Sequence, residues 1–489
     1  MKLLLPRGLA FERLWFRGIA AAVVLFAGLA ALAPGYGYLS VTVLVILALG
    51  TSSFRLLVMV LVFGMVSTLP QIAAVAELVQ VDLLPGTSLN FVGLVRTALA
   101  GVTTVICAAW LTKQWGTSKP YGRWVVILLG YATAGLVWVP RWALGEGLRS
   151  LVQWYLAFGV FLLSMYVAQR RRSVFDFMRL GLVLALILSI GSLVTQNFLP
   201  EITEQGVTDL DRGARLIGLT VSPNLLAGNL TVFATVGFVF FVTPRIGRRW
   251  RSMGGLAFVV TLIPLALTFS RSGWIGVGLG VGLALWLRRK WLWLLPIGLL
   301  ALVVIVSPLG NRFLGDWQAA LSGSDWATTR GFQNAYGRIE YLWKPAVAEL
   351  VTPASAVIGR GPGTAQAWAF SYSSDALHSE LLQIWLDYGL VGLGVFLMLF
   401  WQAAWHSYRL FRYSRSPLFS GLGLAGLSVM AAMLPKMLWD HLFNGPNGWL
   451  LLIVLGLVLG IEKTAVLDLP ERRPRRLTEA HMNADVTTG

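Results

Sequence analysis

The segment DALHSELLQIWLDYGLVG, residues 375–392, begins with titratable side chains and continues as an apolar run. Because imidazole titrates near neutral pH, His378 is a candidate general base. Glu380 follows it by two residues, and positions two apart diverge on a helix, so Glu380 is predicted to play a supporting role. Asp375 is interpreted as a helix cap. The alternative for His378 is a histidine that only caps the helix or forms a hydrogen bond in the interface.

Arginines near the expected outer ends of apolar runs form a second set of candidates. The set comprises Arg215, Arg271, Arg338 and Arg360. A guanidinium is planar, always charged and able to bind phosphate through two donors, so this set beside a histidine fits a pyrophosphate. Fixed arginines would stabilise the charge that develops on a pyrophosphate leaving group without a metal ion. The alternative for any one arginine is a side chain whose head only reaches the lipid headgroups.

Two further residues are candidates on weaker grounds. Arg96 lies about five to seven residues inside an apolar run, and an ionisable residue within a span indicates function by default. Its alternative is a buried ion pair or a contact with a backbone carbonyl. His441, in WDHLFNGPNG, residues 439–448, is the second choice of histidine.

Helices that cross a membrane must position these residues. The chain of 489 residues is 56% hydrophobic and 12% charged, with 21 Trp, which is typical of a membrane protein. Helices satisfy their own backbone hydrogen bonds in lipid, so we predict an all-α polytopic helix bundle with about 12–14 transmembrane helices. The expected spans are 18–34, 38–53, 55–70, 89–112, 123–140, 149–168, 175–198, 215–243, 253–270, 272–287, 291–308, 379–405, 418–434 and 448–462.

The net charge of +17 arises from clusters between these spans. With the N-terminus inside, about 27 of the 39 Lys and Arg fall in cytoplasmic segments, so both termini are predicted to be cytoplasmic. The basic segment 472–476 then faces anionic headgroups, and nucleic acid is not an expected partner. The chain has a single cysteine, Cys107, which excludes an intrachain disulfide.

Two expected outer segments divide the chain. One is acidic, residues 199–216, and the other is a long external loop, residues 309–377, which contains a helical stretch at 335–351 and the turn GRGPG at 359–363. Long loops in a tight bundle are usually functional. We therefore expect N-terminal transmembrane helices at 1–212, a catalytic membrane region at 213–462 and a disordered cytoplasmic tail at 463–489.

Four segments in order resemble the O-antigen ligase and O-antigen polymerase superfamily of bacterial envelope glycosyltransferases. They are GARLIGLTVSPNLLAGNL (213–230), LTFSRSGWIGVG (267–278), GRIEYLW…PASAVIGRGPGTA (337–365) and LHSELLQIWLDYGLVGLGVF (377–396). The chain departs from the family pattern at Ser222, Ser379 and Asp387, where the family commonly has Asn, Asn and Glu.

The resemblance implies a GT-C-like enzyme of the bacterial inner membrane that needs no metal ion or other cofactor. Its donor would be a glycan on undecaprenyl pyrophosphate, and its acceptor another glycan or lipid A core on the periplasmic face. Arg215 and Arg271 would hold the pyrophosphate, and Arg338 would help to bind donor or acceptor. His378 would activate the acceptor hydroxyl, and Asn224 would support the span of Arg215.

Three other readings remain open. A protein O-oligosaccharyltransferase belongs to the same superfamily. A metal-dependent glycosyltransferase would use Asp209 and Asp211 of the acidic segment. A transporter or flippase for a lipid-linked or anionic substrate would use the arginines to line a path, and it predicts charged residues throughout the depth of the bundle.

Overall fold

A computed structural model gives the architecture of the chain. It describes residues 56–58, 60, 80–84, 87–114, 120–198, 216, 220, 222–293, 298, 338–373, 376–443 and 446–466. Several sequence predictions lie outside the described residues: the expected spans 18–34 and 38–53, nearly all of 55–70 and 291–308, the acidic segment with Asp209 and Asp211, Arg215, Asp375, and the tail after residue 466.

The described residues are helical except for one short hairpin and the connecting turns, which confirms the predicted all-α class. The hairpin pairs β1 (Gln80–Leu84) with β2 (Thr87–Asn90) in antiparallel fashion. The helices of the first half are α5 (Phe91–Gln114), α6 (Pro120–Ala134), η1 (Gly135–Trp138), η2 (Arg141–Ala143), α7 (Leu144–Val167) and α8 (Arg171–Phe198).

The second half contains further long helices and a group of short ones. The long helices are α10 (Pro223–Val242), α11 (Arg248–Leu267), α12 (Arg271–Leu287), α20 (Glu380–Tyr413), α21 (Pro417–Trp439) and α22 (Pro446–Val466). The short elements are η4 (Trp291–Trp293), the π-helix η6 (Ile339–Trp343), α17 (Lys344–Leu350), α18 (Pro353–Ile358) and α19 (Thr364–Ser373).

The described residues contain six helices long and apolar enough to cross a membrane, and four shorter apolar helices. The protein is therefore a multi-pass membrane protein. The expected total of 12–14 spans includes segments outside the described residues and stays a prediction.

Three expected boundaries differ from the structure. The eighth span was expected from residue 215, but α10 begins at Pro223, because Ser222 adopts an extended conformation and its hydroxyl accepts a hydrogen bond from the Leu225 amide. α22 continues to Val466, so the first residues of the expected tail complete a helix. The cap of α20 is Ser379 and not Asp375, since the Ser379 hydroxyl accepts from the Leu382 amide at 3.3 Å.

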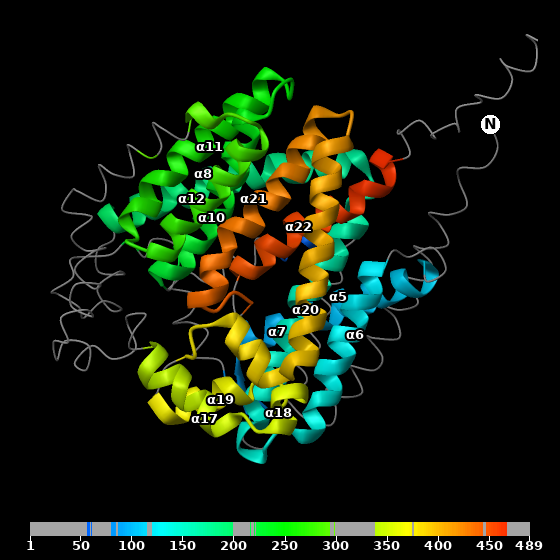
Figure 1. Ribbon diagram of the computed structural model, residues 1–489, viewed down its shortest axis with the longest axis vertical. Helices are drawn as coiled ribbons and strands as arrows, with labels where there is room; N and C mark the ends of the chain where they lie inside the picture. The colour runs from blue at the N-terminus through cyan, green and yellow to red at the C-terminus, as the bar shows by residue number, and fades with distance from the viewer. Residues whose placement is uncertain are drawn as a thin grey trace, which may run out of the picture.

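The long helices form two groups joined by α20 and α21 (Figure 1). In one group α10 packs against α11, α12 and α21, with α8 beside α11. In the other, α7 packs against α5 and α22, and α20 contacts α6. Figure 1 shows α17, α18 and α19 gathered beside the first part of α20. The predicted helical stretch at 335–351 is thus observed as η6 and α17, with 335–337 outside the described residues.

The short helices are held to α20 by backbone contacts that require glycine. Gly389 interrupts α20 with φ 63°, and Gly359 in the GRGPG turn has φ 82°. The Asp387 carboxylate accepts hydrogen bonds from the amides of Gly363 and Ala365 at 3.0 and 2.8 Å, at the start of α19. Asp387, one of the departures from the family pattern, therefore anchors α19 on α20.

Glycines of α12 allow its backbone to approach two neighbouring helices. A Cβ added at Gly273 would lie 3.1 Å from the Ala227 Cβ of α10, and one at Gly280 would lie 2.9 Å from the Ser428 carbonyl oxygen of α21. A Cβ at Gly276 would run into the carbonyl oxygen of Ala432. Small residues of this kind permit close helix packing in membranes. This packing places the start of α12, and therefore Arg271, beside the end of α21.

We expect Gly276→Ala to destabilise the protein by about 1–3 kcal/mol, because the added methyl group meets backbone that cannot move cheaply. The matched control is Gly278→Ala on the same helix, where a Cβ has nothing within 4 Å. That change should be neutral or slightly stabilising, since alanine is the better helix former. Thermal unfolding of the two purified variants in detergent measures both effects, and equal midpoints would contradict the packing argument.

Candidate active site

His378 lies immediately before α20 and has a left-handed backbone, with φ 54°. Its backbone amide donates a hydrogen bond to Nε2 of His441 at 3.0 Å, and the two ring centroids are 5.7 Å apart. The two candidate histidines, which are 63 residues apart in the chain, therefore meet at one place. A non-glycine residue with positive φ is uncommon and marks a position that its surroundings constrain.

Asp440 is the acidic partner of this pair. Its Oδ1 lies 4.0 Å from Nδ1 of His378, within ion-pair range but longer than a hydrogen bond, and it accepts from the His441 amide at 2.9 Å. Burial opposes ionisation of this carboxyl, but the charge of Lys436 and hydrogen bonds outweigh burial and hold the pKa of Asp440 well below its usual range. An ionised carboxylate therefore faces the imidazole of His378.

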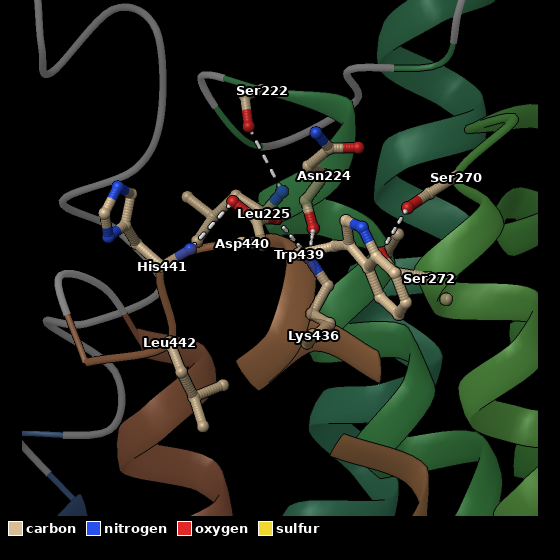
Figure 2. Close-up of polar contacts among 12 residues, drawn as sticks. Ser222, Asn224, Leu225, Ser270, Ser272, Lys436, Trp439, Asp440, His441 and Leu442 are labelled. Atoms are coloured by element: carbon tan, nitrogen blue, oxygen red, sulfur yellow. Dashed lines mark hydrogen bonds and ion pairs between the residues drawn. The ribbon is translucent and has the colours of Figure 1, made fainter. Parts of the chain in front are cut away.

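Lys436 supplies the compensating charge from the last turn of α21. Its side chain is fully buried, and Nζ donates to Oδ2 of Asp440 at 2.8 Å and to the backbone oxygen of Asn224 at 2.6 Å. Figure 2 shows Lys436 between the start of α10, at Asn224, and the segment after α21, at Asp440. One ammonium group therefore joins α10 to the segment that carries His441.

Glu380 fixes the same segment from the other side. It is 2% exposed, and its Oε2 accepts hydrogen bonds from the amides of Leu442 and Phe443 at 2.8 and 3.2 Å. The first residue of α20 thus ties residues 440–443 to the segment that bears His378. This contact agrees with a supporting role for Glu380, and that role stays a prediction.

Two of the candidate arginines reach the same end of the bundle. Arg338 donates from Nη1 to the carbonyl oxygen of Trp439 at 2.7 Å, directly before Asp440. Arg271 is the first residue of α12, and the packing of α12 against α21 places it near the end of α21. Arg360 has a different place, because its Nε donates to the Leu350 carbonyl at the end of α17.

The structure gives less information about the positions of the remaining candidate residues. Arg215 lies outside the described residues, but the next residue, Leu216, donates its amide to the Leu267 carbonyl at the end of α11, close in the chain to Arg271. Asn224 is the second residue of α10 and accepts from Lys436 through its backbone. Arg96 is in the first turns of α5, as the sequence predicts, and its side chain is outside the description.

An open apolar groove of about 580 Å³ is lined in part by Ser379, the residue that follows His378. It runs between η6 and α17 on one side and the start of α20 and the end of α21 on the other. Its lining includes Trp343, Val347, Ala348, Ser379, Leu382, Leu438 and Trp439. Among the described residues that line it, only Lys344 is charged, and it forms an ion pair with Glu340.

Comparison with protein families identifies the segment that contains most of these residues. Residues 256–397 match the family described as O-antigen ligase. This segment is an O-antigen ligase family domain. The family is an enzyme family of glycosyltransferase type that acts in polysaccharide and lipopolysaccharide biosynthesis, which confirms the resemblance predicted from the sequence. None of the curated proteins compared with the chain matches it.

The O-antigen ligase family domain extends from α11 into α20, so it includes Arg271, Arg338 and His378. Three further residues of the candidate site lie beyond this domain. They are Lys436, in the last turn of α21, and Asp440 and His441, directly after that helix. Sequence reasoning did not select Lys436 or Asp440. Their spacing, i and i+4 at the end of an apolar run and directly before a histidine, is the signal that would have found them.

The described residues contain no group of three or more His, Cys, Asp or Glu arranged to hold a metal ion. Asp209 and Asp211, the residues of the metal-dependent alternative, are outside those residues. That alternative therefore depends on the chelator experiment below.

Proposed function

We propose that this protein transfers an oligosaccharide or polysaccharide from undecaprenyl pyrophosphate to an acceptor hydroxyl, as an O-antigen ligase or polymerase. The observation that carries the proposal is that His378, in the O-antigen ligase family domain, faces the ionised Asp440, with Arg271 and Arg338 at the same end of the bundle. A base and a set of fixed cations are what this transfer requires.

His378 is the proposed general base. Asp440 faces Nδ1, so Nε2 is the nitrogen that would take the proton from the acceptor hydroxyl. The acceptor oxygen forms a bond to the anomeric carbon of the donor sugar, and the bond from that carbon to the pyrophosphate oxygen breaks. The carboxylate of Asp440 stabilises the imidazolium that results, in the same manner as the aspartate of a Ser-His-Asp triad.

The arginines are the proposed pyrophosphate ligands. Negative charge grows on the leaving pyrophosphate as its bond to the sugar breaks, and fixed guanidinium groups stabilise it. Arg215 and Arg271 would take this role, and Arg338 would contact donor or acceptor. Arg338 donates from Nη1 to the carbonyl oxygen of Trp439, directly before Asp440, which places its guanidinium group near the proposed base. We propose that Asn224 positions the start of α10 near Arg215 and that Glu380 positions residues 440–443.

The apolar groove supports a polyprenyl donor. It opens at Ser379 and Trp439, next to the site, and its walls are almost entirely hydrocarbon. A polyprenyl chain in this groove would leave its pyrophosphate beside Arg271 and Arg338.

We further propose that the His378 end of the bundle faces the periplasm and that both termini are cytoplasmic. The support is the distribution of charge. The turn between α10 and α11, at the opposite end of both helices from the site, carries Arg245, Arg248, Arg249 and Arg251, as expected of a cytoplasmic turn.

The test is an assay of purified protein with a lipid-linked oligosaccharide as donor, in the presence and absence of EDTA. The donor is supplied alone, with lipid A core or with an acceptor peptide. A ladder of longer products from donor alone identifies a polymerase, and product formed only with lipid A core identifies a ligase. Product on an acceptor peptide identifies a protein O-oligosaccharyltransferase. We expect transfer to persist in EDTA. Loss of transfer in EDTA supports the metal-dependent alternative, and movement of unaltered donor across vesicles without transfer supports a transporter.

A further inference from the structure

A second hollow lies at the end of α10 and α11 opposite to the candidate active site. It has a volume of about 610 Å³, and its polar lining consists chiefly of Arg245, Arg248, Arg251 and Ser252. Asn224 begins α10 at the active-site end, and α10 contains 20 residues, so the two ends of the helix are about 30 Å apart. The hollow is therefore separate from the proposed pyrophosphate site.

The turn between the two helices creates this hollow. Arg245 and Gly247 both have positive φ, 59° and 95°, and both line the hollow together with Arg248 in the first turn of α11. The side chain of Arg251 is held in place, because its Nε donates a hydrogen bond to the carbonyl oxygen of Phe241 at 3.2 Å. Gly255 also lines the hollow, and because it has no side chain it leaves space beside the ring of Phe241.

The hollow carries three positive charges. Arg245, Arg248 and Arg251 are all exposed, and among the described residues no carboxylate contributes to the lining of the hollow. Within the described part of the chain none of these three arginines forms an ion pair. Three guanidinium groups around one concave surface, with a serine hydroxyl among them, match the oxygen atoms of a phosphate diester.

An apolar stripe continues from the hollow along α11. Leu256 lines the hollow and is 54% exposed, and Val259, Ile263 and Leu267 are 57%, 51% and 42% exposed. These residues are three or four apart, so they lie on one face of the helix. A hydrocarbon chain could follow this face from the arginines toward the middle of the membrane.

We propose that this hollow and stripe bind an anionic glycerophospholipid. Its phosphate would occupy the space among Arg245, Arg248 and Arg251, and an acyl chain would lie along Leu256, Val259 and Ile263. A zwitterionic lipid with the same chains would place its own cation among three arginines, so the site favours a headgroup with net negative charge. This binding does not depend on the proposed transferase activity.

The experiment measures binding of dioleoyl phosphatidylglycerol to the full-length protein in neutral detergent by native mass spectrometry. The comparison ligands are dioleoyl phosphatidylcholine and inorganic pyrophosphate. Of these three ligands, we expect only phosphatidylglycerol to bind tightly. The variant Arg245→Gln/Arg248→Gln/Arg251→Gln should weaken its Kd by about a hundredfold, since each basic side chain near the phosphate contributes to the attraction. The double variant Arg245→Gln/Arg248→Gln keeps the Arg251–Phe241 bond and should still weaken binding by about tenfold or more.

The matched control for the double variant is Arg412→Gln/Arg415→Gln, which removes two exposed basic charges that do not line the hollow. This variant should bind phosphatidylglycerol within about threefold of the unaltered protein, because exposed charges outside the hollow are screened by salt. Equal weakening by the control set overturns the proposal, as it indicates general attraction only. Equal binding of phosphatidylcholine also overturns it, and binding of pyrophosphate as tight as that of the lipid indicates a free-phosphate site instead.

Discussion

Replacing His378 with alanine is expected to lower the rate of glycan transfer by about 10²–10⁴-fold, the range that general-base catalysis contributes. The physical reason is the loss of the imidazole that faces the Asp440 carboxylate. The backbone bond from His378 to Nε2 of His441 uses the main chain, so alanine leaves it in place. The measurement is the transfer rate with saturating lipid-linked donor and acceptor, together with the thermal midpoint of the variant.

A second substitution separates chemistry from backbone strain. His378 has φ 54°, a conformation that alanine adopts with some cost and that asparagine tolerates better. His378→Asn should therefore keep the local backbone and still lose the activity. The matched control is His406→Gln, also at a histidine but near the far end of α20, where transfer should be nearly unchanged. Activity in the His378→Asn protein close to that of the unaltered enzyme would rule out His378 as the base.

Replacing Lys436 with methionine is expected to destabilise the protein by about 3–5 kcal/mol, because the change leaves the Asp440 carboxylate largely buried without its ammonium partner. Methionine retains most of the hydrocarbon stem of lysine, so the loss reports mainly the charge. The change also removes the link from α21 to the Asn224 carbonyl. Chemical or thermal unfolding of the purified variant in detergent, followed by tryptophan fluorescence, measures the effect.

A surface ion pair with the same spacing provides the control. Lys344 contacts Glu340 at 2.6 Å, also four residues apart, but its side chain is 64% exposed. Lys344→Met should therefore cost no more than about 1 kcal/mol. The double variant Lys436→Met/Asp440→Asn should recover part of the stability lost in Lys436→Met, since it removes the uncompensated charge. Equal destabilisation by the Lys344 and Lys436 changes would contradict a buried ion pair at the site.

The class of the fold and most of its helices can be predicted from local sequence patterns. Apolar runs of membrane-spanning length predict helices because lipid offers no partner for backbone hydrogen bonds, and α5, α7, α8, α11, α12, α20 and α21 lie where those runs predict. Family motifs around Arg271, Arg338 and His378 were also visible, and the O-antigen ligase match over 256–397 confirms the family assignment. The helix predictions and the family assignment both depend on local patterns along the chain.

The first residue of a helix is harder to predict from the sequence where a single capping side chain fixes it. The Ser222 hydroxyl begins α10 eight residues later than the apolar run predicts, and Ser379 rather than Asp375 caps α20. A hydropathy pattern averages over many residues, whereas a cap depends on one hydrogen bond.

Which polar groups contact one another depends on how the helices pack in three dimensions. Lys436 contacts Asn224 across 212 residues, and Glu380 accepts from Leu442 across 62 residues. From the sequence Lys436 is one basic residue at the end of a span, and Asp440 is one acidic residue beside a histidine. Their charges become part of a site because the close packing of α10, α12 and α21 excludes water there, and a buried charge must be paired. That pairing depends on helices distant in the chain, and no local pattern encodes it.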